Sequence, residues 1–184
     1  LGSLVTKFGF KNKSNKGIAE GRGGRRGPEN VWGSAATGTI IAILIRCEIG
    51  SQAILLIGFV ASFAAKLADT FGSELGKVWG TKTFLITSFK TAKPGTDGAI
   101  SIEGTVASLA GSLIMTSAMA CLSLVPNSLS FLIIVTTGFL ATIIESIIGA
   151  TIQKRFKSLT NELVNFLQTT LSSIIAIIAA TIIF

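Results

Sequence analysis

Four of the nine carboxylates in this 184-residue chain lie in two short polar motifs between long apolar stretches. The first motif is ADTFGSELGK at residues 68–77, and the second is PGTDGAISIEGT at residues 94–105. Their acidic residues are Asp69, Glu74, Asp97 and Glu103. Isolated charges beside lipid are costly, so a membrane-like sequence that concentrates them is typical of a functional site. Together with the lysines nearby, these carboxylates predict metal and phosphate chemistry at a lipid boundary.

The first motif is expected to continue the helix that precedes it. Residues three or four positions apart share a face of a helix, which places Asp69 beside Ser73. The same spacing places Glu74 beside Lys77. Carboxylate and hydroxyl oxygens would then point toward one cation. In the alternative interpretation, the carboxylates only form ion pairs with Lys66 and Lys77 at the membrane interface.

The second motif predicts a turn, because Pro94-Gly95 and Asp97-Gly98 are both favourable turn pairs. An ordinary connection between two helices would explain the turn taken alone. The motif follows the first one closely, however, and it leads to Glu103 at the entrance of the next apolar stretch. We therefore expect it to form the second wall of the same site.

Residues 1–30 are basic and rich in glycine, and they end in GRGGRRGPEN at 21–30. Closely spaced glycines disfavour a stable helix, so we expect a flexible loop. Arg22, Arg25 and Arg26 could bind a phosphate through bidentate contacts while the glycines let backbone N–H groups approach the anion. The alternative is a basic anchor that contacts anionic lipid. The spacing is not that of the nucleotide-binding GxxxxGK[ST] loop.

Three polar residues stand out near the later apolar stretches. Glu145 is the sole charged residue between Glu103 and Lys154, and a carboxylate in a membrane usually faces a polar cavity or another helix. Asn161 and Asn165 are four residues apart and share a helix face. They fit either ligand binding or hydrogen bonding between helices.

Composition indicates the elements that position these residues. The chain is 49% hydrophobic and only 14% charged, with a mean hydropathy of +0.68, whereas an average soluble domain has about 25% charged residues. Apolar stretches run over residues 31–45, 51–68, 104–125, 130–152 and 162–184. We therefore expect an all-α, polytopic transmembrane bundle of about five spanning helices. The bundle would occupy residues 31–184, after the loop at 1–30, with a catalytic loop at about 69–104.

Basic residues predict the orientation, since short loops rich in Lys and Arg stay on the cytoplasmic side. Threading five helices places three basic segments on one face of the membrane, and the connection after the first helix, on the opposite face, carries Arg46. The net charge of +7 is therefore a signal of membrane topology. Nucleic acid is not an expected partner, because the cations are spread over three segments that are attached to membrane helices. The basic residues of these segments are Lys7, Lys11, Lys13, Lys16, Arg22, Arg25, Arg26, Lys77, Lys82, Lys90, Lys93, Lys154, Arg155 and Lys157.

Missing residue types limit the chemistry further. The chain has no His and no Tyr, which excludes Ser–His catalysis and imidazole metal sites and leaves oxygen-ligated divalent cations. Cys47 and Cys121 show no metal-ligand spacing, and we expect them to be structural. The chain begins at Leu1 rather than Met in a basic segment with no signal peptide, which is consistent with an N-terminally truncated sequence.

Five motifs in this order resemble one integral-membrane family. They are GIAEGRGGRRGPENVWGSAATG, ADTFGSELGK, FKTAKPGTDGAISIEGT, ESIIGATIQ and TNELVNF. The family is the one that includes the plant and cyanobacterial phytyl-phosphate kinases, and the resemblance covers nearly the whole chain. The two acidic motifs are also broadly similar to those of polyprenol kinases and phosphatidate cytidylyltransferases, which use CTP and a divalent metal.

The resemblance implies transfer of a phosphoryl group from a nucleoside triphosphate, with CTP expected, to phytyl phosphate in tocopherol and prenylquinone synthesis. It implies Mg²⁺ as cofactor, an isoprenoid phosphate partner whose tail lies between apolar helices, and a cyanobacterial or plastid membrane with the basic loops on the cytoplasmic or stromal side. The implied catalytic residues are Asp69, Glu74, Lys77, Asp97 and Glu103, of which Asp69, Glu74 and Asp97 would bind the metal. The implied phosphate contacts are Arg22, Arg25, Arg26, Asn30, Lys66 and Lys90.

Two alternatives remain open at this point. A related enzyme acting on another polyprenyl or lipid phosphate, including a cytidylyltransferase, would carry similar metal and triphosphate motifs. A transporter could use Lys66, Asp69, Glu74 and Glu145 for ion coupling, although no clear internal repeat supports it. The sequence leaves the nucleotide, the tail length and the oligomeric state undetermined.

Overall fold

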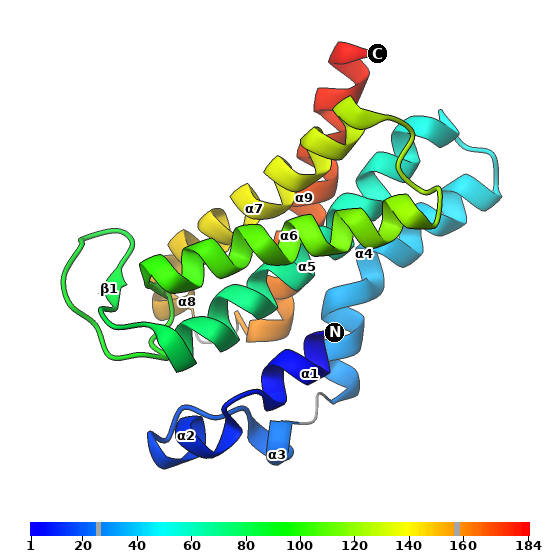
Figure 1. The fold of residues 1–184 in the computed structure, drawn as a ribbon. Coiled ribbons are helices and arrows are strands. Elements are labelled where there is room, and N and C mark those ends of the chain that lie inside the picture. Colours follow the sequence, from blue (N-terminus) through cyan, green and yellow to red (C-terminus); the bar gives the residue numbers. More distant parts are fainter. Residues whose placement is uncertain (25–26, 157–158) are drawn as a thin grey trace.

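The computed structural model describes residues 1–24, 27–156 and 159–184 (Figure 1). Within these ranges the architecture is a bundle of five long helices, with a small two-stranded sheet beside it. The long helices are α4 (Pro28–Arg46), α5 (Gln52–Trp79), α6 (Ile102–Cys121), α7 (Ser128–Ala150) and α9 (Asn161–Ile183). The shorter elements are α1 (Gly2–Lys7), α2 (Phe10–Asn15), α3 (Gly21–Gly24), α8 (Ile152–Arg155), β1 (Phe84–Leu85) and β2 (Ala99–Ile100).

Four helices of the described chain, α5, α6, α7 and α9, are long and apolar enough to cross a membrane. The expected all-α, polytopic membrane fold is therefore confirmed. Helix α4 covers the first expected span at 31–45, but it does not belong to this set of four. Its first turn carries Glu29 and Asn30, and its last residue is Arg46, so charged or polar residues stand at both ends of α4.

Helix α5 is the centre of the bundle and packs against each of the other four long helices. Its contact with α6 is close because small residues face each other. A Cβ atom at Gly72 would lie 2.0 Å from Ser108 Oγ, and one at Gly111 would lie 2.8 Å from the carbonyl oxygen of Leu67. The glycines of the first acidic motif therefore have a packing role, and α5 runs through them without a break.

Polar side chains join α9 to α5. The hydroxyls of Ser172 and Ser173 donate to the carbonyl oxygens of Ala61 at 3.1 Å and Gly58 at 2.7 Å. The Gln168 amide donates to the carbonyl of Ala65 at 3.1 Å. Such bonds, together with small side chains, are a common way for helices to associate where lipid removes the hydrophobic driving force.

The N-terminal segment differs from the expectation. Where the glycine content predicts a flexible loop over residues 1–30, the structure has the short helices α1, α2 and α3, and α4 begins at Pro28. Helices α1 and α2 contact α5. Gly9 separates them with a φ of +62°, and a Cβ atom there would lie 2.8 Å from Val78 Cγ2. The glycine thus permits a tight turn against α5 rather than flexibility.

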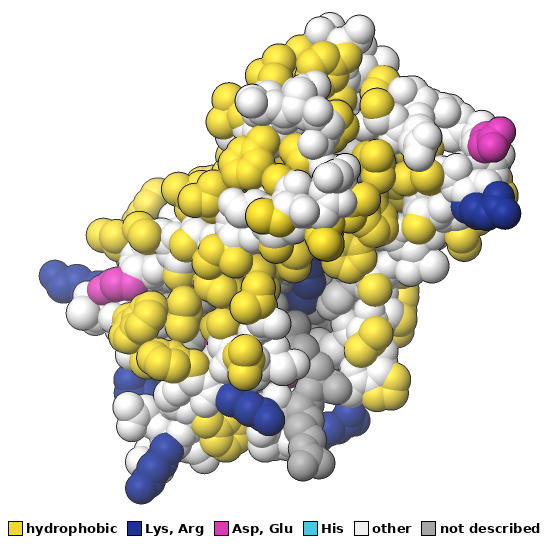
Figure 2. Space-filling model, turned by 45° about the vertical axis from the view of Figure 1, so that its right-hand side comes forward, with side chains coloured by type: hydrophobic (Ala, Val, Ile, Leu, Met, Phe, Trp, Pro, Cys, Tyr) yellow, Lys and Arg dark blue, Asp and Glu magenta, His cyan; other side chains and the backbone are white. Residues whose placement is uncertain are grey.

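The basic segments lie at one end of the bundle, as the five alternating helices require. In Figure 1 the N-terminal helices, the loop with β1 and the region around α8 are at the lower left, opposite the two connections at the upper right. Figure 2 shows a broad hydrophobic surface above this end, where Lys and Arg side chains gather. Arg46, the last residue of α4, and Glu48, in the connection between α4 and α5, lie at the opposite end. The structure thus agrees with the expected grouping of the basic loops.

Candidate functional site

A polar cavity of about 290 Å³ opens at the basic end of the bundle. It is bounded by the C-terminal half of α5, the start of α6, the end of α7, the start of α9 and the loop that leads into β2. The cavity brings together most of the residues that the sequence singles out. These lining residues are Asn30, Lys66, Asp69, Glu74, Lys77, Asp97, Glu145, Asn161 and Asn165.

Asp69 and Lys66 form the inner part of the cavity. The Lys66 ammonium donates to Asp69 Oδ2 at 2.7 Å and to Asn165 Oδ1 at 2.8 Å. The side chains of Lys66 and Asp69 are only 11% and 17% exposed. This contact links α5 to α9 and holds one oxygen of Asp69, so the other oxygen faces the cavity without a recorded partner in the described chain.

Glu74 is held on both sides by lysines. Lys77 donates to Glu74 Oε1 at 2.9 Å, and Lys13 of α2 donates to Glu74 Oε2. Lys13 is completely buried and also donates to the carbonyl oxygen of Thr6 at 2.8 Å. Because lysines occupy both oxygens, Glu74 joins α2 to α5 in this structure, and it is a less available metal ligand than Asp69.

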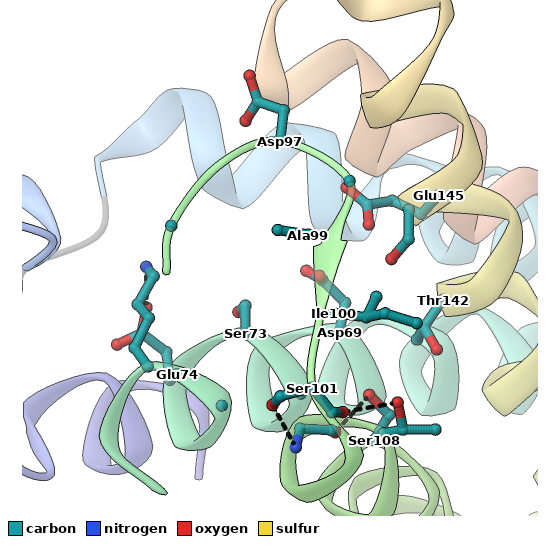
Figure 3. A pocket seen from close by; sticks show the side chains of 18 of the residues that line it. Asp69, Ser73, Glu74, Asp97, Ala99, Ile100, Ser101, Ser108, Thr142 and Glu145 are labelled. Carbon is teal, nitrogen blue, oxygen red and sulfur yellow. Dashed lines mark hydrogen bonds and ion pairs between the residues drawn. The ribbon is translucent and has the colours of Figure 1, made fainter. Parts of the chain in front are cut away.

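The second motif forms a wall of the cavity, as its spacing indicates. Strand β2 pairs antiparallel with β1, and the loop before it lies against the end of α7. Gly98 has a φ of +72°, and a Cβ atom there would lie 2.4 Å from the backbone nitrogen of Ala150. Glycine is therefore needed for this close contact, which holds the loop that carries Asp97 against the helix that carries Glu145 (Figure 3).

The start of α6 also lines the cavity. Ser101 caps this helix by accepting a hydrogen bond from the Gly104 N–H at 3.1 Å, and Ser101, Gly104 and Thr105 all belong to the lining. A helix N-terminus favours anions because its first N–H groups have no partners within the helix. The cavity thus contains both carboxylates and groups that can bind an anion.

Other expected site residues lie elsewhere. Glu103 accepts hydrogen bonds through Oε1 from the Thr81 hydroxyl at 2.7 Å and the Thr81 N–H at 3.1 Å, and it does not line the cavity. Arg22 pairs with Glu29 at 2.9 Å on the surface, with 64% of its side chain exposed. Lys90 is exposed and also absent from the lining. Arg25 and Arg26 lie outside the described residues.

The expected metal site is not formed by protein carboxylates alone. Among the residues that the structure describes, no three His, Cys, Asp or Glu side chains are close enough to hold a metal ion together. Mg²⁺, however, usually keeps several waters and binds one or two carboxylates together with substrate phosphates. Asp69, with one oxygen that has no recorded partner in the described chain, fits that kind of site. Asp97 and Glu145 also line the cavity, although Figure 3 shows the Asp97 side chain directed away from Asp69.

Several lining residues are not among those that the sequence singles out as candidates. Glu20, between α2 and α3, reaches the cavity, and the hydroxyl residues Thr96, Thr142 and Ser146 line it as well. Thr142 and Ser146 are four residues apart and flank Glu145, so helical spacing around this charged residue could have identified them. Nothing in the local sequence marks Glu20 as part of the cavity.

The fold and the cavity define a polytopic membrane protein with a charged pocket at one end of its helix bundle. The chain belongs to the integral membrane protein family DUF92, whose model matches residues 1–173.

The chain is similar in sequence to the following three relatives. The uncharacterized membrane protein sll0875 of Synechocystis is 46% identical over 96% of this chain and 69% of its own length. Protein VTE6, chloroplastic, of Arabidopsis thaliana is 40% identical over 97% of this chain. The match covers 55% of the length of VTE6, so this chain spans about half of that protein. The uncharacterized membrane protein MJ0933 of Methanocaldococcus jannaschii is 33% identical over 97% of this chain and 71% of its length. No solved structure matches the chain.

Proposed function

We propose that this protein is a membrane isoprenoid-phosphate kinase. It would transfer the γ-phosphoryl group of a nucleoside triphosphate, CTP in our proposal, to phytyl phosphate or a similar isoprenoid monophosphate. The single observation that carries the proposal is the polar cavity that gathers Asp69, Asp97 and Glu145 with Lys66 and Lys77 at the edge of a membrane bundle. The motif resemblance to phytyl-phosphate kinases supplies the substrate class.

The chemistry suits a site without histidine. A phosphate monoester is already an oxyanion at neutral pH, so the acceptor needs no general base. Its oxygen forms a bond to the γ-phosphorus, the bond from the γ-phosphorus to the bridging oxygen breaks, and a nucleoside diphosphate leaves. The main obstacle is the repulsion between two polyanions, which positioning and charge neutralisation relieve.

We assign phosphate binding and Mg²⁺ binding to different residues of the cavity. Lys66, Lys77 and the N-terminus of α6 would bind phosphate oxygens, and Asn161 and Asn165 would orient them by hydrogen bonds. Asp69, with Asp97 or Glu145, would hold Mg²⁺. When bound, Mg²⁺ supplies charge neutralisation and a template for the two substrates. Glu74 would have an indirect role, because it positions Lys77 and holds α2 against α5 through Lys13.

The location of the protein follows from the same proposal. With cyanobacterial and chloroplast relatives, we propose a cyanobacterial or plastid membrane, with the basic end and the cavity on the cytoplasmic or stromal side. The positive-inside rule supports this orientation.

Product analysis tests the function. Purified protein in liposomes is incubated with phytyl phosphate or geranylgeranyl phosphate, Mg²⁺ and each nucleoside triphosphate in turn. The proposal requires an isoprenoid diphosphate together with a nucleoside diphosphate. A nucleotidyl lipid with pyrophosphate would instead indicate cytidylyl transfer, and substrate flux without nucleotide consumption would indicate a transporter.

A further inference from the structure

A second hollow, which is apolar, lies beside the polar cavity. It has a volume of about 260 Å³ and lies between α1, α4, α5 and α6. Its apolar and small lining residues are Val31, Ser34, Ala35, Phe63, Leu67 and Met115. Figure 2 shows a basic side chain recessed among hydrophobic side chains on one face of the bundle. We call this hollow the apolar groove.

The apolar groove and the polar cavity meet at two residues. Lys66 and Asn30 line both of them. Lys66 has three N–H donors, and within the described residues partners are recorded for two of them, Asp69 and Asn165. The third donor is therefore available to an anion at the junction. One side of this junction is polar and charged, and the other side is apolar.

We propose that the apolar groove holds the first part of the prenyl chain of an isoprenoid monophosphate, with its phosphate beside Lys66 in the polar cavity. This inference rests on the proposed function and adds a tail site to it. An amphiphile with one anionic end and a hydrocarbon chain is complementary to this site, since its anion matches the Lys66 ammonium and its chain matches the apolar lining. Transfer of the hydrocarbon chain from water to an apolar lining is also favourable.

The volume limits how much of the chain the groove holds. An apolar cavity of about 150 Å³ can bind benzene, which is about 25 Å³ per carbon atom. On that scale the groove of about 260 Å³ holds roughly ten carbon atoms, or two isoprene units. The remainder of a phytyl chain would continue past α4 and α6 into the lipid. The groove should therefore distinguish substrates by their first two isoprene units and tolerate longer tails.

Photo-crosslinking without nucleotide tests the tail site directly. The probe is geranylgeranyl phosphate with a diazirine on its second isoprene unit, added to the full-length protein in liposomes. We expect label on residues 31–35 of α4 and near Phe63, and unlabelled geranyl phosphate should compete for it. Label confined to other segments would overturn the proposal. Equal competition by phosphatidate would also overturn it, because it would assign the groove to acyl chains of membrane lipids.

A matched pair of variants gives a second readout. Ala35→Leu fills the groove, whereas Ala42→Leu makes the same change at an exposed position of α4 outside the groove. The larger Leu side chain would occupy space that the prenyl chain needs, and forcing both into the groove is unfavourable. We therefore expect Ala35→Leu to lower the crosslinking yield about tenfold. The Ala42→Leu protein should stay within about twofold of the unmodified protein, as surface changes usually do.

The two proposals can fail separately. A protein that crosslinks in the groove but forms no isoprenoid diphosphate would refute the kinase and leave the tail site standing. A protein that forms the diphosphate equally well with Ala35→Leu and Ala42→Leu, for geranyl phosphate as for a single-isoprene phosphate, would refute the tail site and leave the kinase standing.

Discussion

Replacing Glu74 by Gln is expected to release the N-terminal helices from the bundle. The side chains of Lys13 and Glu74 are 0% and 3% exposed, so the substitution leaves a buried ammonium beside neutral acceptors, the Thr6 carbonyl and the Gln amide oxygen, without the negative charge that compensates it. Removing one partner of a buried ion pair costs about 3–5 kcal/mol. Since 1.4 kcal/mol is a factor of about ten, the opening equilibrium of α2 should rise by roughly two to three and a half orders of magnitude.

Amide hydrogen exchange in liposomes or nanodiscs measures this opening. Exchange of the α2 amides, residues 10–15, should accelerate in Glu74→Gln, while the amides of α7 and α9 keep their protection. Glu29→Gln is the matched control, because it removes the exposed pair with Arg22 and should change the opening free energy by at most about 1 kcal/mol. Adding Lys13→Met to Glu74→Gln should restore part of the protection, since the unpaired buried charge is then gone. Unchanged exchange of α2 in Glu74→Gln, or an equal effect of Glu29→Gln, would refute the reasoning.

Three further predictions concern the cavity and the topology. Asp69→Asn keeps the side-chain shape but removes the charge offered to Mg²⁺, so turnover should fall about a thousandfold or more while the protein still inserts into membranes; near-normal turnover would leave only the ion pair with Lys66 as its role. Gly98→Ala should lower turnover and increase proteolysis of the loop before β2, because a Cβ atom there meets Ala150; unchanged loop protection would show that this contact is dispensable. In a background without native cysteines, Cys introduced at Ser88 and at Asn127 should be labelled from opposite sides of the membrane, and labelling of both from one side would contradict the orientation of the bundle.

Much of the fold follows from local sequence properties. Long apolar runs predict the positions of α5, α6, α7 and α9, because a bilayer requires about 20 apolar residues in a helix. The short N-terminal helices could not be predicted in this way. Nothing in the sequence distinguishes the buried Lys13 from nearby lysines that are exposed, and only the fold brings it to Glu74, 61 positions away.

The candidate site is predictable to a similar degree. Asp69 and Asp97 stand out as members of the two acidic motifs and Glu145 as an isolated charge in an apolar stretch, and all three line one cavity in the structure. Glu103 stands out equally in the sequence, but the start of α6 directs it toward Thr81 rather than into the cavity. Charge and spacing identify which side chains need a partner. They do not determine which partner the three-dimensional fold supplies.

The central claim is that the cavity transfers a γ-phosphoryl group to an isoprenoid monophosphate. The most direct measurement uses CTP labelled with radioactive phosphorus at the γ position, phytyl phosphate and the purified protein in liposomes, with Asp69→Asn and Glu48→Gln as paired variants. Glu48 lies at the opposite end of the bundle and serves as the control for the loss of a carboxylate. The account predicts radioactive phytyl diphosphate from the unmodified protein and from Glu48→Gln, and almost none from Asp69→Asn. Label that remains in nucleotide or pyrophosphate, with no radioactive lipid from any of the three proteins, would contradict it.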